Sequence, residues 1–212
     1  MIFASAQSTA ASPRIDQWHG LRLGSSTPEE AVQAFGKPET DDKRADAHFE
    51  PIWGTSGLYK LVMPTPGERL RRQRFAHKRA VPGFESVELT YLNDKLVCIS
   101  LEPEAAIPFA EILKTYGLEL QLWNLSRNDQ FLGPLQLDEQ PTGAQPTGES
   151  GPDSLLRTFY ATACQDGNVL GARGSTLTTA RKGIVTRLLL ISPRYVHPRE
   201  ISARPKTETI LK

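Results

Sequence analysis

An alternating pattern between residues 87 and 101 constrains this chain more than any other feature of its sequence. Asn93-Asp94 marks a tight turn at its centre, and the second half, residues 96–101, is apolar except for Ser100. A period of two places apolar side chains on one face of a strand, and a two-residue turn joins two such strands. The pattern therefore predicts an antiparallel β-hairpin in which Cys98 and Ile99 point to opposite faces. In the first strand the alternating apolar residues are Val87, Leu89 and Tyr91.

Two short helices are predicted, the first from its caps and the second from its periodicity. Thr27 suits an N-cap, Pro28 suits the first helical position, and Glu30 completes a capping box. Gly36 then favours a helix end. The second helix is expected at about residues 105–116, where apolar side chains recur at helical spacing. Its apolar residues are Phe109, Ile112, Leu113 and Tyr116.

These elements predict an α+β protein with short helices packed on an antiparallel β-sheet. Residues 1–14 are expected to be a disordered N-terminus or the remnant of a signal peptide. A helix-plus-hairpin unit is expected over 15–103, and a second α+β unit with a flexible loop at 133–153 over 104–200. Residues 201–212 are expected to form a tail. Each helix lies between a proline and an aromatic-Gly pair, so the two units are candidates for a duplication that shares one sheet.

Composition and charge exclude several classes of protein. The chain has 212 residues, 39% of them hydrophobic, and a formal net charge of +1. This apolar fraction can bury a core, which argues against wholesale disorder. The near-neutral charge argues against a dedicated nucleic-acid protein. No stretch approaches the roughly 18–20 apolar residues that span a bilayer, so no transmembrane segment is predicted.

Residues 69–79 form a basic run, the densest cluster of like charges in the sequence. Such a cluster can bind the phosphates of nucleic acid or anionic lipid, with Phe75 and His77 available to stack on bases. The other interpretation is a solvated strand edge or loop whose charge the acidic residues at 41–46 neutralise. We favour the second interpretation because the whole chain is nearly neutral. The candidate anion-binding residues are Arg69, Arg71, Arg72, Arg74, Lys78 and Arg79.

The sequence offers no catalytic or metal-binding motif. It contains no nucleophile elbow, no Walker loop, no dinucleotide-binding glycine pattern and no zinc-protease motif. His48 with Glu50 or Asp46 is the nearest approach to a metal site, and an exposed loop histidine is the expected alternative. We therefore predict no cofactor, no metal and no enzyme, and keep a hydrolase with a triad assembled by the fold as the least favoured alternative. The four histidines are His19, His48, His77 and His197.

The cysteines and the N-terminal residues give information about the cellular compartment of the protein. Cys98 and Cys164 either pair in an oxidising compartment or remain single as small apolar residues, and their spacing does not decide between these outcomes. Ala4-Ser5-Ala6 has the small-x-small pattern of a signal-peptide cleavage site, although a basic and apolar stretch before it is missing. We predict a periplasmic or secreted protein, with a cytoplasmic protein as the alternative.

The three tryptophans are either core anchors or exposed binding residues. Trp53 follows Ile52 and is expected in the core. Trp18 precedes the first helix and is expected to fasten the N-terminal segment to the sheet. For Trp123 the two interpretations stay open.

The segment from Gly20 to Pro38 combines a Gly-Ser turn, a short acidic helix and a Gly-x-Pro stop, and residues 87–97 form the predicted hairpin. This combination resembles BamE/SmpA-like and β-lactamase-inhibitor-protein-like modules over roughly residues 18–101. The longer pattern also resembles an uncharacterised group of secreted bacterial proteins. The first resemblance implies a bacterial envelope or secreted location and non-enzymatic protein binding. The chain departs from these modules in its insert between helix and hairpin and in its whole C-terminal half, and no binding residue carries over.

We therefore predict an exported, non-enzymatic module that binds another protein or an envelope component through its sheet face or loops. Anion binding through the basic run is the first alternative, with nucleic acid or anionic lipid as the partner. A hydrolase is the second.

Overall fold

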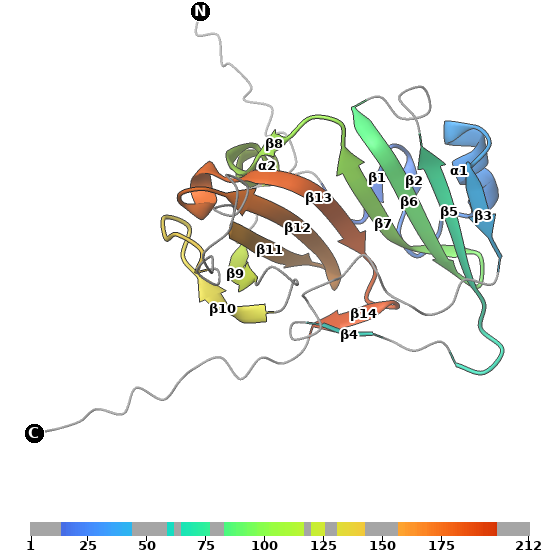
Figure 1. Ribbon diagram of the computed structural model, residues 1–212. Helices are drawn as coiled ribbons and strands as arrows, with labels where there is room; N and C mark the ends of the chain where they lie inside the picture. The colour runs from blue at the N-terminus through green and yellow to red at the C-terminus, as the bar shows by residue number, and fades with distance from the viewer. Residues whose placement is uncertain are drawn as a thin grey trace, which may run out of the picture.

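One antiparallel sheet of ten strands forms the frame of the molecule (Figure 1). The structure, a computed structural model, describes residues 14–43, 59–61, 65–76, 83–116, 120–125, 131–142 and 157–198. The strand order is β10-β9-β11-β12-β13-β7-β6-β5-β3, and β8 pairs with the beginning of β13. The strands are β3 (Thr40–Asp42), β5 (Leu70–Ala76), β6 (Phe84–Leu92), β7 (Lys95–Pro103), β8 (Ile107–Pro108), β9 (Gln121–Leu125), β10 (Phe131–Leu135), β11 (Arg157–Gln165), β12 (Asn168–Thr176) and β13 (Ile184–Ile191).

Smaller elements lie beside this sheet. Two further strand pairs are β1 (Gln17–Trp18) with β2 (Leu21–Arg22), and β4 (Tyr59–Leu61) with β14 (Val196–Pro198). The helices are α1 (Pro28–Phe35), α2 (Phe109–Tyr116) and the 3₁₀ turn η3 (Ala180–Lys182). Within the described ranges, no helix has the length and apolar character needed to cross a membrane.

The predicted α+β class, with its helix-plus-sheet units, is wrong. The described chain is mostly β-structure, and its two α-helices have eight residues each. Each helix buries only two side chains, Pro28 and Ala31 in α1 and Phe109 and Ile112 in α2, so helices supply little of the core. Four strands of nine residues supply much more of it. The capping signals located the first helix correctly, but they carry no information about how much of the core a helix supplies.

The predicted hairpin and the first helix are both confirmed. Strands β6 and β7 pair as an antiparallel hairpin around Asn93 and Asp94, whose φ angles of 50° and 56° match a type I′ turn. In α1, the Thr27 hydroxyl accepts a hydrogen bond from the backbone N–H of Glu30 at 3.3 Å. The Glu30 carboxylate accepts one from the backbone N–H of Thr27 at 3.0 Å. The capping box therefore forms as the sequence predicts.

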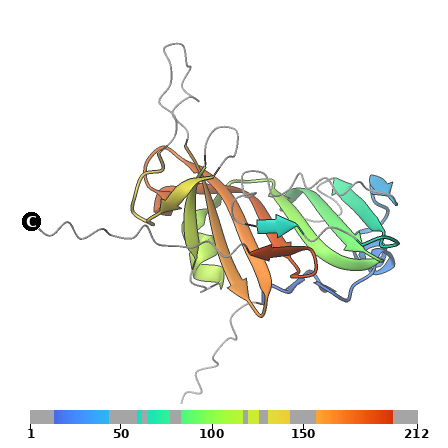
Figure 2. The same ribbon diagram turned by 90° about the horizontal axis from the view of Figure 1, so that it is seen from below.

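An apolar cluster lies on each face of the sheet. On the first face, α1, the β1–β2 pair and α2 pack over apolar side chains that include Leu89, Ile99 and Leu190 (Figure 2). On the second face, a separate apolar cluster includes Cys98, Ile191 and Tyr195. In β13, Leu190 and Ile191 enter different clusters, as a period of two requires. In β7 a register shift near the turn interrupts the alternation, so Val97 and Cys98 both enter the second cluster.

The predicted flexible loop at 133–153 begins with ordered structure. Leu135 is the last residue of β10, is 4% exposed, and lies opposite Leu122 of β9. Pro141 is also buried. The remainder of that loop lies outside the described residues, as do Trp53, the first 13 residues and the predicted tail at 201–212.

Phe159 of β11 packs against two backbone positions that lack side chains. A Cβ at Gly174 or at Gly183 would lie 2.4 Å from a carbon of the Phe159 ring. The ring is fully buried and makes an edge contact with Phe109 of α2, with 5.1 Å between centroids. These glycines therefore let the ring approach the backbone and join the sheet to α2.

We expect Gly183→Ala to lower the free energy of unfolding by about 1–3 kcal/mol, because the new methyl group would overlap the Phe159 ring. Gly183 has a φ of −71°, so alanine adds no backbone strain there. Urea denaturation measures the loss. In a Phe159→Leu background the same substitution should cost less, and an equal cost in both backgrounds would contradict the packing explanation.

Candidate functional site

The structure divides the described arginines of the basic run between the two faces of the sheet. Strand alternation turns Arg71 toward the first face of the sheet and sends Arg72 and Arg74 to the second. Arg69 lies exposed before β5 begins. The remaining two candidates, Lys78 and Arg79, lie outside the described residues.

Acidic residues neutralise the part of the run that faces the helix. The Arg71 guanidinium donates two hydrogen bonds to the Asp41 carboxylate, both at 2.8 Å. Glu29 at 3.4 Å and Asp94 at 3.6 Å surround the same guanidinium. Hydrogen bonding from Arg71 holds the pKa of Asp41 below its usual value. The expectation that the acidic residues near 41 neutralise this run is therefore confirmed for Arg71.

The second face carries a charged stripe across β5, β6, β7, β13 and β12. Arg72 lies 3.5 Å from Glu88, and Arg187 forms an ion pair with Glu102. The stripe continues to Arg173, which lies directly opposite Arg187 in the β12–β13 register. The two arginines are neighbours in the backbone register, but their side chains diverge: the Arg187 guanidinium lies beside Glu102 and that of Arg173 lies elsewhere.

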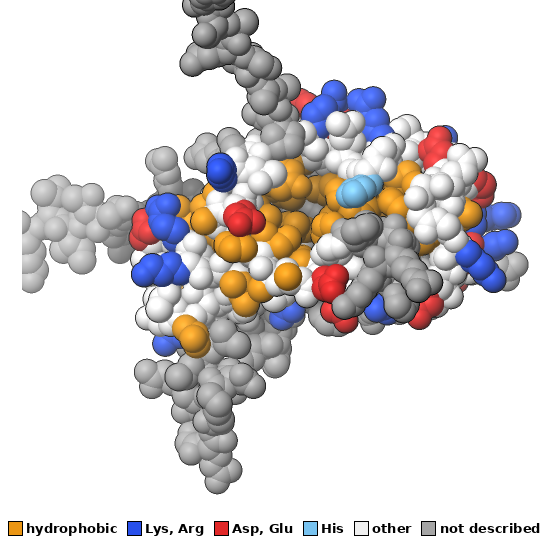
Figure 3. All heavy atoms as spheres, turned by 90° about the horizontal axis from the view of Figure 1, so that it is seen from above, with side chains coloured by type: hydrophobic (Ala, Val, Ile, Leu, Met, Phe, Trp, Pro, Cys, Tyr) orange, Lys and Arg blue, Asp and Glu red, His pale blue; other side chains and the backbone are white. Residues whose placement is uncertain are grey.

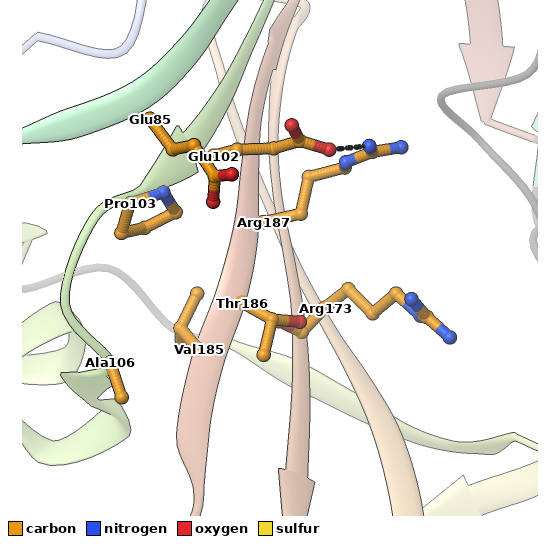
Figure 4. A pocket seen from close by; sticks show the side chains of 8 residues that line it. All are labelled: Glu85, Glu102, Pro103, Ala106, Arg173, Val185, Thr186 and Arg187. Carbon is orange, nitrogen blue, oxygen red and sulfur yellow. Dashed lines mark hydrogen bonds and ion pairs between the residues drawn. The ribbon is translucent and has the colours of Figure 1, made fainter. Parts of the chain in front are cut away.

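A pocket of about 410 Å³ opens along this stripe (Figure 4). The pairing of β13 with β7 ends at Leu188 and Leu101, and β13 pairs with β8 from Val185 to Ile184. The pocket therefore lies where β7 leaves the sheet. Its lining is Glu85, Glu102, Pro103, Ala106, Arg173, Val185, Thr186 and Arg187.

Glu102 is fixed at the wall of this pocket. Its carboxylate accepts a hydrogen bond from the Ser86 hydroxyl at 2.5 Å and another from Arg187. Burial acts to raise the pKa of Glu102, but these hydrogen bonds outweigh burial and hold the pKa below its usual value. Glu102 is therefore an anion at neutral pH. Glu85 lines the same pocket and is exposed.

A second candidate surface is a cluster of aromatic rings at the end of α1. Trp18 lies 5.6 Å from Phe35 and 5.4 Å from Phe84, measured between ring centroids, and His19 lies 4.4 Å from Trp18. We call Trp18, His19, Phe35 and Phe84 the aromatic surface, because all four keep some solvent exposure. Phe75 of β5 lies beneath it, 5.5 Å from Phe35, and is buried. The expectation that Trp18 fastens the N-terminal segment to the sheet is confirmed by these contacts.

A groove of about 500 Å³ continues from the aromatic surface along α1. Seen from above, hydrophobic side chains gather across the molecule beside a histidine, and the surface between them is hollowed (Figure 3). Polar groups line much of the groove, so it offers both hydrogen bonds and apolar contact. Its lining is His19, Gly20, Leu21, Arg22, Ser25, Ser26, Glu30, Gln33 and Ala34.

Cys98 and Cys164 do not form a disulfide and are free. Cys98 lies opposite Ile191, Ile191 opposite Val169, and Val169 opposite Cys164, so two strands separate the cysteines. Adjacent strands lie about 4.8 Å apart, which puts the two well beyond the reach of a disulfide. Burial raises the pKa of the Cys98 thiol, so this thiol is a poor nucleophile.

The described residues bring together no metal site. They contain no group of three or more His, Cys, Asp or Glu that could hold a metal ion. His48 and His77 lie outside the described residues, and of His197 only the backbone is described. His19 contacts the rings of Trp18 and Phe35.

For Trp123 the sequence did not decide between a core anchor and an exposed binding residue. The structure shows that Trp123 is buried and donates a hydrogen bond to the Thr162 hydroxyl at 3.4 Å.

Sequence reasoning identified neither the pair of arginines in the pocket nor the whole aromatic surface. Arg173 and Arg187 meet only through the β12–β13 register, and no local motif indicates that register. The aromatic surface joins β1, α1 and the start of β6. Its one signal in the sequence was Trp18 beside His19, just before the capped helix.

We expect Asp41→Asn to lower the free energy of unfolding by about 1–2 kcal/mol at about pH 7, because charge-assisted hydrogen bonds to the largely buried Arg71 are lost. The pKa of Asp41 is lower in the folded than in the unfolded state, so the stabilisation is present above the unfolded value of about 4. It disappears as the pH falls through the folded value.

Urea denaturation at about pH 7 and about pH 3 tests this dependence. The difference between the wild-type chain and Asp41→Asn should shrink at the lower pH. A Glu111→Gln variant, altered on the exposed side of α2, serves as the control and should match the wild-type chain at both values. A difference for Asp41→Asn that is the same at both pH values would contradict the ion-pair explanation.

Comparison with known proteins leaves the resemblance seen in the sequence untested. No family model matches the chain, and neither the curated proteins nor the solved structures contain a match. The relationship to BamE/SmpA-like and β-lactamase-inhibitor-protein-like modules therefore stays a prediction from the first half of the sequence.

Proposed function

We propose that this chain is a non-enzymatic binding module that uses the aromatic surface and the adjoining groove to bind a protein partner. The observation that carries the proposal is the set of partly exposed rings of Trp18, Phe35 and Phe84 around His19. Tryptophan and other aromatic residues are enriched at the energetically dominant positions of protein interfaces. Aromatic rings that stay partly exposed around an open groove can give apolar area to a partner.

The surroundings of these rings favour a protein over a small molecule. Val32, one turn before Phe35 on the same helix, is 38% exposed and extends the apolar area along α1. The groove adds the charged side chains of Arg22 and Glu30, which supply a polar rim. An apolar centre with a polar rim is the usual anatomy of a protein interface.

Charge argues against the basic run as the main interface. Asp41 occupies the guanidinium of Arg71, and Glu88 lies beside Arg72. A phosphate backbone would have to displace both carboxylates. Among the described residues, the run therefore supports binding of nucleic acid or anionic lipid less well than the aromatic surface supports binding of protein.

Photo-crosslinking tests the proposed surface in the cells that make the protein. A photoreactive residue at position 32 is expected to give a discrete adduct with another protein. The same residue in place of Leu177, which is 58% exposed in the β12–η3 turn, is the matched control and should give none. Trp18→Ala should remove the adduct while a circular-dichroism spectrum shows a folded chain. Equal adducts from both positions, or none from position 32, would contradict the proposal.

We also propose that the module acts in the periplasm or outside the cell. This location is supported by Ala4-Ser5-Ala6 and by the resemblance to envelope modules. Cell fractionation measures it directly. Recovery of the chain in the periplasmic or secreted fraction is the expected result, and recovery in the cytosol alone would overturn this part of the proposal.

A further inference from the structure

The pocket where β7 leaves the sheet has opposite charges at its two ends. Figure 4 shows Glu85 at one end and Arg173 at the other, with Glu102 and Arg187 joined between them. The formal charges of these side chains cancel, so the pocket has no excess charge that would attract a simple anion. Its distinguishing property is the separation of the two signs.

Part of the wall of the pocket is apolar. Pro103, Ala106 and Val185 line the pocket beside the hydroxyl-bearing Thr186. A volume of about 410 Å³ falls within the usual range of small-molecule sites, roughly 300–1,000 Å³. The pocket therefore suits a short molecule with a small apolar middle and a charge at each end.

The groups at the arginine end suit a carboxylate. Arg173 stands at this end of the pocket, and a guanidinium group binds a carboxylate with paired hydrogen bonds. The guanidinium of Arg187 is held by Glu102, which also accepts a hydrogen bond from Ser86.

The group at the other end suits an ammonium ion. Glu85 reaches the pocket from the start of β6, where the β6–β7 register shifts between Phe84 and Ser86. A β-bulge of this kind redirects a side chain relative to regular alternation. The Glu85 carboxylate is therefore placed beside the pocket, close to where β7 leaves the sheet.

We propose that this pocket binds a small zwitterion with its carboxylate and ammonium groups at opposite ends, the pattern of a free dipeptide with small apolar side chains. The carboxylate binds Arg173, and the ammonium group binds Glu85. The site is separate from the aromatic surface and does not depend on the function proposed for that surface.

Dialanine is the probe, and chemical-shift titration of the full chain measures its binding. Two blocked forms are compared with it: N-acetyl-dialanine, which lacks the ammonium group, and dialanine amide, which lacks the carboxylate. Each block should weaken binding by about tenfold or more, as expected for the loss of one charge-assisted contact. Shift changes should be confined to residues that line the pocket.

Two variants test which side chain binds each end of the ligand. Arg173→Gln should weaken dialanine about tenfold and leave the amide unaffected, whereas Glu85→Gln should weaken dialanine and leave the acetylated form unaffected. Arg69→Gln and Glu111→Gln, both exposed and outside the pocket lining, are the matched controls and should bind as the wild-type chain does. Circular dichroism confirms that each variant is folded.

Three results would overturn the proposal. The first is the absence of dialanine binding at millimolar concentration. The second is equal binding of dialanine and its acetylated form, or competition by inorganic phosphate as strong as by dialanine, since either would identify a site for anions alone. The third is shift changes that map to the groove along α1 instead of the pocket.

Discussion

The pairing of β7 with β13 is the interaction on which the rest of the structure depends. Four residue pairs, from Leu101 with Leu188 to Cys98 with Ile191, join strands that are separated by more than 80 positions in the chain. Without them, the first and second halves of the chain would form two narrower sheets, each with an unpaired edge. With them, a single sheet carries one apolar cluster on each face. The same pairing also creates the polar pocket, because that pocket opens where the pairing ends.

Alternation along β5 separates neighbouring arginines of the basic run. Neighbouring residues of a strand face opposite sides of the sheet, so Arg71 meets Asp41 on one side and Arg72 meets Glu88 on the other. The charges of these two arginines therefore lie in two environments, and each is opposed by a carboxylate. A run of like charges in a sequence predicts a charged patch only when the segment is a loop or one face of a helix.

The fold and the candidate site differ in how far they follow from the sequence. The β6–β7 hairpin and the α1 capping box were predictable because each depends on residues within a few positions of one another. The aromatic surface was only partly predictable, since Trp18 alone indicated it and Phe84 joins it from a strand far along the chain. The Arg173–Arg187 pair was not predictable, because two adjacent strands must be in register before these residues meet.

The sequence by itself determined the local elements: where the first helix begins and ends, and where the hairpin turns. It did not determine every strand face, because the register shift in the hairpin places Val97 with Cys98 and Leu96 with Ile99. Capping, turn geometry and a period of two are local properties, so they can be recognised without knowledge of the fold. Only the tertiary structure decided that these elements form one sheet, that Cys98 and Cys164 stay apart, and that opposite charges meet in one pocket. Those outcomes depend on which distant strands pair, and pairing is decided by burial of the whole sheet instead of by any single segment.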